Sequence, residues 1–216
     1  AKYEQDLSKL TAEAERYKKE EVPAKLRQWL EKNRAKKSQE PASPWTVLRA
    51  EPLVSKGGTK FERQADGSYL ATGPNPDFDT YTFVAPAPFE KIHAVRIEAL
   101  AHESMVKGGP GRAGNGNIGL SDVAITANNT PLKLANPRAT FNQTDNLHVK
   151  LTIDENKKSG WAVDPQFGKD HAAVYEVANP EAVAGENKRL TFTLGFNVNT
   201  RHNIGRLRIS VSSRPA

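Results

Sequence analysis

Two hydrophobic periodicities divide the chain. Up to about residue 37, apolar side chains recur at spacings of three and four residues, which predicts an amphipathic helix with charged residues on its other faces. The apolar positions of this stretch are Tyr3, Leu7, Leu10, Ala14 and Tyr17, followed by Leu26, Trp29 and Leu30. Because the residue before a proline avoids the α region, Val22-Pro23 predicts a break between two helices.

The apolar stripe of residues 1–37 is too narrow to form a core by itself. We therefore expect it to pack on a neighbour: the rest of the chain, another copy, or a domain that this sequence does not include. A helical connector is the preferred interpretation, and a dedicated coiled-coil dimer is the alternative. Residues 38–44 are rich in proline and small polar side chains, which predicts a linker.

After the linker, apolar and polar residues alternate in short segments that turn signals such as Asp66-Gly67 separate. The predicted strands are residues 46–54, 60–63, 68–71, 80–84, 92–100, 117–126, 132–141, 147–153, 172–177, 189–196 and 206–211. The alternation is clearest in the last two segments, where one face is apolar throughout. About ten strands with hardly a helical period predict an all-β fold for residues 45–216, a two-sheet sandwich of jelly-roll type.

A glycine-dense loop precedes one of these strands. Six of the twelve residues from Gly108 to Gly119 are glycine. Glycine permits positive φ angles and close backbone approach, so the loop predicts a bend at the rim of a sheet or a ligand contact. It lacks the Gly-Lys-Ser/Thr sequence opening a helix that a phosphate-binding loop needs. A change of phase between Leu120 and Val123 predicts a β-bulge in the strand that follows.

Composition narrows the classes of function. The chain has no cysteine, which excludes disulfides, thiolate metal sites and catalytic thiols. Its net charge is +6, but residues 1–40 carry 11 basic against 8 acidic side chains and the remainder 20 against 17. No basic run is interleaved with aromatic residues, so we expect no nucleic-acid partner. Every apolar run is shorter than the roughly 18 residues of a spanning helix, so we expect no membrane span.

Several motifs occur in order along the β region. They are residues 79–82 (Asp-Thr-Tyr-Thr), 96–100 (Arg-Ile-Glu-Ala-Leu), 109–117, 141–143 (Phe-Asn-Gln), 153–154 (Ile-Asp), 160–162 (Gly-Trp-Ala) and 202–211. Through them residues 45–213 resemble the β-sandwich module of a planctomycete-specific, cytochrome-associated family of large exported proteins. The pair Ile153-Asp154 followed by Gly160-Trp161 is also similar to galactose-binding, discoidin-like modules, although Glu155-Asn156 replace their Gly-Asp turn.

This resemblance implies a carbohydrate-binding module of galactose-binding type, located between flanking domains of a periplasmic or extracellular protein. The haem segment of the family is absent from this chain, so no redox role carries over. The helical residues before the linker are similar to the connector of the family.

Seven residues are candidates for ligand contact. Trp161 could stack on a sugar ring or could belong to the core. Arg112, Asn115 and Asn117 offer groups that hold hydroxyls in pairs, although the two asparagines could instead serve turn geometry. His202 and Asn203 precede the final strand, and Arg206 lies on its polar face; they could bind a ligand or pair with carboxylates.

Asn75, Asp77 and Asp79 alternate through a loop and offer hard oxygen ligands, so structural calcium is the one cofactor that we consider. The loop lacks the glycine and the terminal glutamate of an EF-hand. The five histidines stand apart, and no nucleophile-elbow motif places a catalytic serine, so we expect no enzyme.

We expect a non-catalytic carbohydrate-binding module. Arg112 and Arg206 favour an acidic or sulfated polysaccharide, because guanidinium groups pair with sulfate and carboxylate. The alternative is a structural module that docks flanking domains, and an enzyme acting on glycans is third. A solvent-exposed trough lined by Trp161, Arg112 and His202 would favour glycan binding, whereas a flat apolar patch would favour docking.

Overall fold

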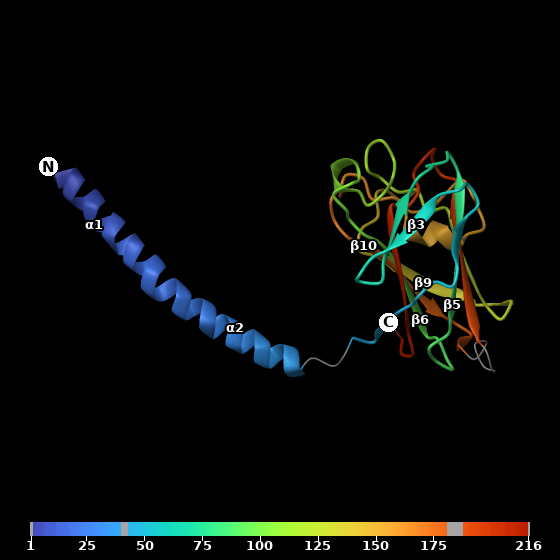
Figure 1. Cartoon of the computed structure of the whole chain (residues 1–216), viewed down its shortest axis with the longest axis horizontal. Helices are drawn as coiled ribbons and strands as arrows, with labels where there is room; N and C mark the ends of the chain where they lie inside the picture. Colours follow the sequence, from blue (N-terminus) through green and yellow to red (C-terminus); the bar gives the residue numbers. More distant parts are fainter. Residues whose placement is uncertain (1, 40–42, 181–187, 216) are drawn as a thin grey trace. The chain divides into compact units, whose positions relative to one another are not determined.

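The chain consists of two units, residues 1–43 and residues 44–216. A computed structural model describes residues 2–39, 43–180 and 188–215 of them. The first unit is helical, and the second gathers the strands (Figure 1).

The helical unit runs through α1 (Lys2–Arg16), a π-helical turn (Tyr17–Glu21) and α2 (Val22–Gln39). The predicted break at Val22-Pro23 is wrong, because the chain stays helical across it. An α-helical turn would drive the Pro23 ring into the carbonyl four residues earlier. The wider π turn immediately before it relieves this crowding, with Val22 N–H donating to Tyr17 O. Helix α2 extends into the predicted linker as far as Gln39, and residues 40–42 of that linker lie outside the described residues.

The β unit contains two antiparallel sheets. Its strands are β1 (Trp45–Val47), β2 (Leu53–Ser55), β3 (Lys60–Arg63), β4 (Tyr69–Thr72), β5 (Asp79–Pro86), β6 (Ala94–Ala99), β7 (Asp122–Ala127), β8 (Thr130–Pro131), β9 (Leu134–Ala139), β10 (His171–Val177), β11 (Arg189–Phe196) and β12 (Arg206–Ser212). Two short 3₁₀ helices, Val106–Gly108 and Val149–Ile153, lie in loops. The seven-stranded sheet has the order β3-β4-β12-β6-β10-β9, with β1 also on β12. The five-stranded sheet has the order β2-β5-β11-β7-β8.

One core lies between the sheets. Phe61 of β3 packs edge-on against Tyr81 of β5 at 4.8 Å, and Tyr69 of β4 packs against Phe83 of β5 at 5.8 Å. These ring pairs join the two sheets, and buried side chains from both fill the space between them. The prediction of an all-β sandwich is therefore confirmed at this level.

The alternation in the last two strands is also confirmed. Leu190, Phe192, Leu194 and Phe196 of β11 are all fully buried. In β12 the inward side chains Leu207, Ile209 and Val211 are buried as well. A period of two fixes which face meets the core, so these strands were predictable from the sequence.

Three predicted strands differ from the structure. Residues 46–54 form two strands, β1 and β2, in different sheets, because Pro52 cannot continue a ladder as a donor. Residues 147–153 hold a 3₁₀ helix, whose start His148 caps by accepting Lys150 N–H. Residues 117–126 become a strand only at Asp122, and Leu120 instead bridges Trp161. The apolar spacing changes after Leu120 because β7 begins only at Asp122. A β-bulge, which the sequence had predicted, is not the reason for this change.

Candidate functional site

The glycine-dense loop is a bend fixed by backbone hydrogen bonds. Arg112 N–H donates to Asn203 O and Gly119 N–H donates to His202 O, so the loop is tied to the segment before β12. Gly116 has a φ of +88°, and a Cβ there would lie 2.5 Å from Val106 O. This position requires glycine for both reasons.

The Arg112 side chain binds the neighbouring loop at Gly73 and Pro74, and it does not project into solvent from the glycine-dense loop. Its Nη1 donates to Pro74 O at 2.6 Å and to Thr59 Oγ1 at 3.3 Å, and its Nη2 donates to Gly73 O at 2.6 Å. The half-buried guanidinium thus carries three contacts to its own chain. A ligand would have to displace these contacts to use Arg112.

The structure brings Asn75, Arg112 and Asn203 together. Asn75 Nδ2 donates to Arg112 O at 2.9 Å, and Asn203 Nδ2 donates to Asn75 Oδ1 at 2.8 Å. Asn203 is fully buried, and its Oδ1 accepts no hydrogen bond among the described residues. His202 lies beside it, half-buried, with Nδ1 2.7 Å from Thr200 O. The hydrogen bonds of this group connect three loops to one another.

Trp161 belongs to the core. Its side chain is 0% exposed, and Nε1 donates to Phe141 O at 2.7 Å. Because its indole is fully buried, Trp161 cannot stack on a sugar in this structure, and of the two interpretations of this residue the core interpretation applies. A fully buried indole with its N–H paired is a packing residue.

The two remaining asparagines serve the local backbone. Asn115 Oδ1 accepts Asn117 N–H at 3.0 Å, an Asx-type turn. Asn117 is buried, and its Oδ1 accepts the N–H groups of Ile118 and Val163, both at 2.9 Å. Its Nδ2 donates to Gln143 Oε1. For Asn117, the turn interpretation replaces the ligand interpretation.

The residues considered for calcium do not fit a metal ion. Both carboxylate oxygens of Asp79 are occupied, and its side chain is buried. The donors are Ser55 Oγ (2.6 Å), Gly57 N (2.8 Å), Thr59 Oγ1 (3.1 Å) and Thr80 N (2.7 Å). Asp77 pairs with Arg201 at 3.1 Å. Calcium would have to break these bonds, and the part of the chain that the structure describes holds no group of three acidic or histidine side chains suited to a metal.

Arg206 lies elsewhere, on the outer face of the seven-stranded sheet. Its Nε donates to Ser68 Oγ at 2.8 Å and its Nη2 to Asp66 Oδ2 at 2.9 Å. Burial would raise the pKa of Asp66, but hydrogen bonds from Ser68 and the charge of Arg206 outweigh it and lower that pKa to about 2. Arg206 is thus paired with a carboxylate, as one of the two sequence interpretations expected.

The same outer face carries a groove that sequence reasoning missed. It has a volume of about 470 Å³, and we call it the sheet-face groove. It is lined by Pro44, Trp45, Arg138, Thr140, Ala172 and Val174, with Ala139 and Pro215 completing it. These side chains come from the start of β1, the end of β9 and the outward positions of β10.

Strand register places Arg96 next to Val174, one of the residues that line the groove. Ser210 of β12, Arg96 of β6 and Val174 of β10 are direct neighbours across three strands, and Arg138 of β9 follows them. The Arg96 guanidinium carbon lies 5.0 Å from the centroid of the Trp45 ring, a cation–π contact. Burial lowers the pKa of Arg96, and the neighbouring Glu98 carboxylate opposes that effect.

Two polar atoms on this row have no hydrogen-bond partner among the described residues. They are Arg96 Nε and Ser210 Oγ. Arg96 Nε lies 3.5 Å from Glu98 Oε2, close enough for an ion pair but without hydrogen-bond geometry, and Arg208 makes two hydrogen bonds to that carboxylate. Buried donors are nearly always paired in folded proteins. A ligand that offers a hydrogen-bond acceptor to these two atoms would therefore gain more binding energy here than elsewhere on this face.

Comparisons with protein-family models, curated proteins and solved structures find no significant match. Within residues 2–39, 43–180 and 188–215, no helix combines the length and apolar character needed to cross a bilayer.

Proposed function

We propose that residues 44–216 form a non-catalytic glycan-binding module that holds an acidic or sulfated polysaccharide in the sheet-face groove. The Trp45 ring above Arg96, at the side of that groove, is the observation that carries the proposal. On this proposal the sandwich is a jelly roll of galactose-binding type. The module works within a larger exported protein of periplasmic or extracellular location, as the resemblance to the cytochrome-associated family implies.

The chemistry of the groove supports an anionic sugar. An exposed part of an indole face packs on the C–H groups of a pyranose ring. Arg138 is exposed at the groove, and guanidinium groups match sulfate and carboxylate with paired hydrogen bonds. An anionic group of the ligand would share this guanidinium with Glu176, its partner at 3.2 Å. Such contacts weaken as salt screens them.

The carboxylates of this face favour binding over catalysis. Asp66 and Glu98 are held by arginines, and Glu176 pairs with Arg138 at 3.2 Å. A glycosidase needs one carboxyl group as an acid and a second as a base or nucleophile across the scissile bond. Carboxylates committed to arginines are poorly prepared for either task.

A structural docking module is the second candidate, and the aliphatic part of the groove favours it. Ala139, Ala172 and Val174 give the groove an apolar side that a protein loop from a flanking domain could cover. A glycan-binding module should bind a soluble sulfated polymer, and this binding should weaken as salt is added. A docking module should not bind such a polymer.

Binding to dextran sulfate, with unsulfated dextran of equal length as the control polymer, tests the glycan proposal. We expect binding to dextran sulfate that weakens between low and physiological salt, and a loss of about tenfold in Trp45→Ala. Trp45→Phe, which keeps an aromatic face, should retain most of the affinity and report on folding through its melting temperature.

Two controls sharpen this test. Gln28→Ser changes an exposed residue of the helical unit and should leave binding unchanged. Double-stranded DNA of similar charge should bind more weakly than dextran sulfate. Equal binding of dextran and dextran sulfate, or unchanged affinity in Trp45→Ala, would contradict the proposal.

A further inference from the structure

The helical unit exposes one apolar stripe. In α1 and the first residue of the π turn, Tyr3, Leu7, Leu10 and Tyr17 are 77%, 53%, 63% and 45% exposed. Together with Ala14 they follow a strict alternation of four and three residues, the heptad spacing of a coiled-coil seam. The stripe is therefore suited to pairing with another helix.

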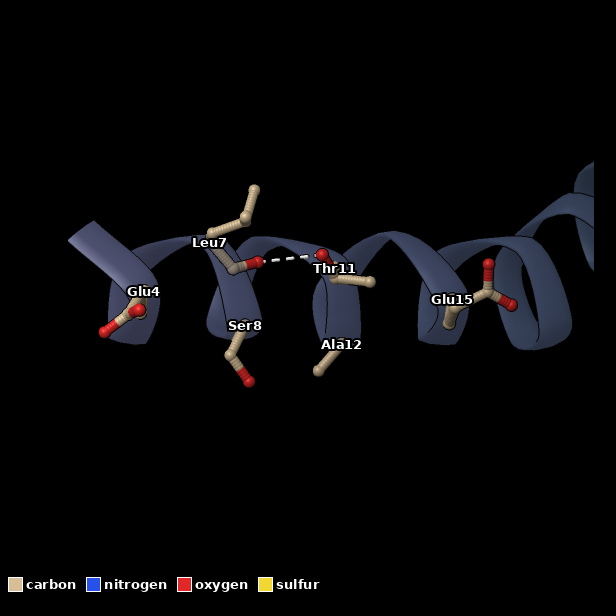
Figure 2. A pocket seen from close by; sticks show the side chains of 6 residues that line it. All are labelled: Glu4, Leu7, Ser8, Thr11, Ala12 and Glu15. Atoms are coloured by element: carbon tan, nitrogen blue, oxygen red, sulfur yellow. Dashed lines mark hydrogen bonds between the residues drawn. The ribbon is translucent and has the colours of Figure 1, made fainter. Parts of the chain in front are cut away.

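The other faces of α1 do not share this character. Figure 2 shows Leu7 pointing away from Ser8 and Ala12, with Glu4 on the N-terminal side of these residues and Glu15 on their C-terminal side. These side chains border a shallow hollow of about 460 Å³ on one side of a single helix. We assign no ligand to this hollow, because side chains of one exposed helix form it, with Leu7 of the apolar stripe among them.

The π turn joins two halves of the stripe. Along an ideal α-helix, the five steps from Tyr17 to Val22 would turn about 500°, which is about 140° past a full turn. The π turn instead closes about one full turn with five residues, as the bond from Val22 N–H to Tyr17 O shows. It therefore places Val22 above Tyr17 on the same side of the helix.

The second half of the stripe follows from this alignment. Val22, Leu26, Trp29 and Leu30 are 43%, 53%, 60% and 52% exposed. They recur at spacings of three and four from Val22, so they continue the line of Tyr3 to Tyr17. In a regular α-helix of the same sequence, Val22 would lie about 140° away from Tyr17, and the two halves would face different directions. The result is one seam along most of α1 and α2.

Formal charge selects the direction of the partner helix. Residues 2–16 carry four acidic and three basic side chains, whereas residues 22–39 carry one acidic and six basic side chains. A parallel pair of such helices would set the two strongly basic halves side by side. An antiparallel pair sets each basic half against the weakly acidic half of its partner, which lowers the repulsion.

We infer that the helical unit pairs with the same unit of a second copy of this chain, as an antiparallel two-helix coiled coil along the Tyr3–Leu30 seam. A second copy supplies both the matching seam and the complementary charge. Pairing also accounts for a stable helix here, because most helical stability in proteins comes from packing an apolar face. This inference is independent of glycan binding.

Sedimentation of the full chain from micromolar to submillimolar concentration tests the pairing. We expect a monomer–dimer equilibrium that Leu10→Ser or Leu26→Ser weakens at least about tenfold. Gln28→Ser changes a residue away from the seam and should leave the equilibrium unchanged. Far-ultraviolet circular dichroism at high concentration reports whether a variant still forms the helix. A chain that stays monomeric throughout, or seam variants that dimerise like the parent, would overturn the inference.

Energy transfer between labels tests the direction. The chain has no cysteine, so Glu4→Cys and Glu31→Cys each provide a single labelling site. In an antiparallel dimer, a donor at residue 4 lies near an acceptor at residue 31 of the other copy. Two residue-4 labels lie roughly 40 Å apart, since 27 residues rise about 1.5 Å each. We expect strong transfer for the 4/31 mixture and weak transfer for the 4/4 mixture, and the reverse order would overturn the antiparallel arrangement.

Discussion

The Arg208 guanidinium holds the Glu98 carboxylate with two hydrogen bonds, from Nε to Oε2 at 2.8 Å and from Nη2 to Oε1 at 2.9 Å. Glu98 is only 6% exposed although it lies on the outer face of its sheet. These bonds to Glu98 raise the pKa of Arg208. A nearly buried carboxylate therefore depends on one arginine, with Arg96 as a weaker second partner.

Arg208→Met should lower the free energy of unfolding by ~3 kcal/mol, because it leaves the buried Glu98 charge without hydrogen bonds. Arg201→Met removes the exposed pair with Asp77, whose side chains are 67% and 59% exposed, and should cost less than ~1 kcal/mol. Urea unfolding of both variants measures the difference. Similar losses in the two variants would mean that the Glu98 pair is no more valuable than a surface pair.

Gly116→Val should destabilise the β unit by more than ~1 kcal/mol, because its φ is positive and its Cβ would meet Val106 O. Gly114 lies two residues earlier, is exposed, and leaves its Cβ more than 4 Å from any atom outside its neighbours. Gly114→Val is therefore the matched control and should change the melting temperature little. An unchanged melting temperature in Gly116→Val would show that the loop can adopt another conformation.

Asp79→Ala should cost ~3 kcal/mol, since it removes a buried carboxylate that accepts four hydrogen bonds. Because both carboxylate oxygens are already occupied, the melting temperature of the parent chain should be the same in calcium chloride and in EDTA. Differential scanning calorimetry measures both effects. A calcium-dependent rise in melting temperature that Asp77→Asn removes would restore the calcium hypothesis.

Asp66 predicts a defined loss of stability in acid. Its pKa falls from 3.8 to about 2 on folding, so the ionised side chain stabilises the fold above its unfolded pKa and ceases to do so as the pH falls toward the folded value. The parent chain and Asp66→Asn should therefore differ in melting temperature near neutral pH and converge between pH 3.8 and about 2. The group is partly exposed, so the difference will be modest. A difference that stays constant down to pH 2 would point to packing instead of charge.

Local patterns predicted the parts of the fold that local physics determines. Alternation in β11 and β12 fixed their inward faces, and the density of glycine at residues 108–119 marked a bend with positive φ angles. The pattern failed where a side chain or a turn overrides it. Pro52 separates two strands that the alternation over residues 46–54 had suggested as one, and the cap at His148 allows a 3₁₀ helix in a segment of strand-like composition.

The candidate site was less predictable, because burial and partners depend on residues far along the chain. Trp161 and Trp45 are the same residue type, yet one packs in the core and the other lines a groove. Arg112 binds carbonyls about 38 residues away. The row of Ser210, Arg96 and Val174 arises only when β12, β6 and β10 pair. The one available signal was Trp45 itself, an aromatic residue at the end of the linker.

The β unit should fold without the helical unit. Among the residues that the structure describes, the buried core lies between Leu48 and Val211, and residues 1–43 form a separate unit. We therefore expect a chain that begins at Pro44 to unfold in one cooperative transition, with a melting temperature close to that of the β transition in the full chain. Near-ultraviolet circular dichroism follows the buried Trp161 and reports the tertiary structure directly.

The full-length variant Leu10→Ser is the control, because it alters the apolar stripe while keeping the helix attached. Loss of the cooperative transition in the shortened chain, with its retention in Leu10→Ser, would show that residues 1–43 contribute to the fold of the β unit.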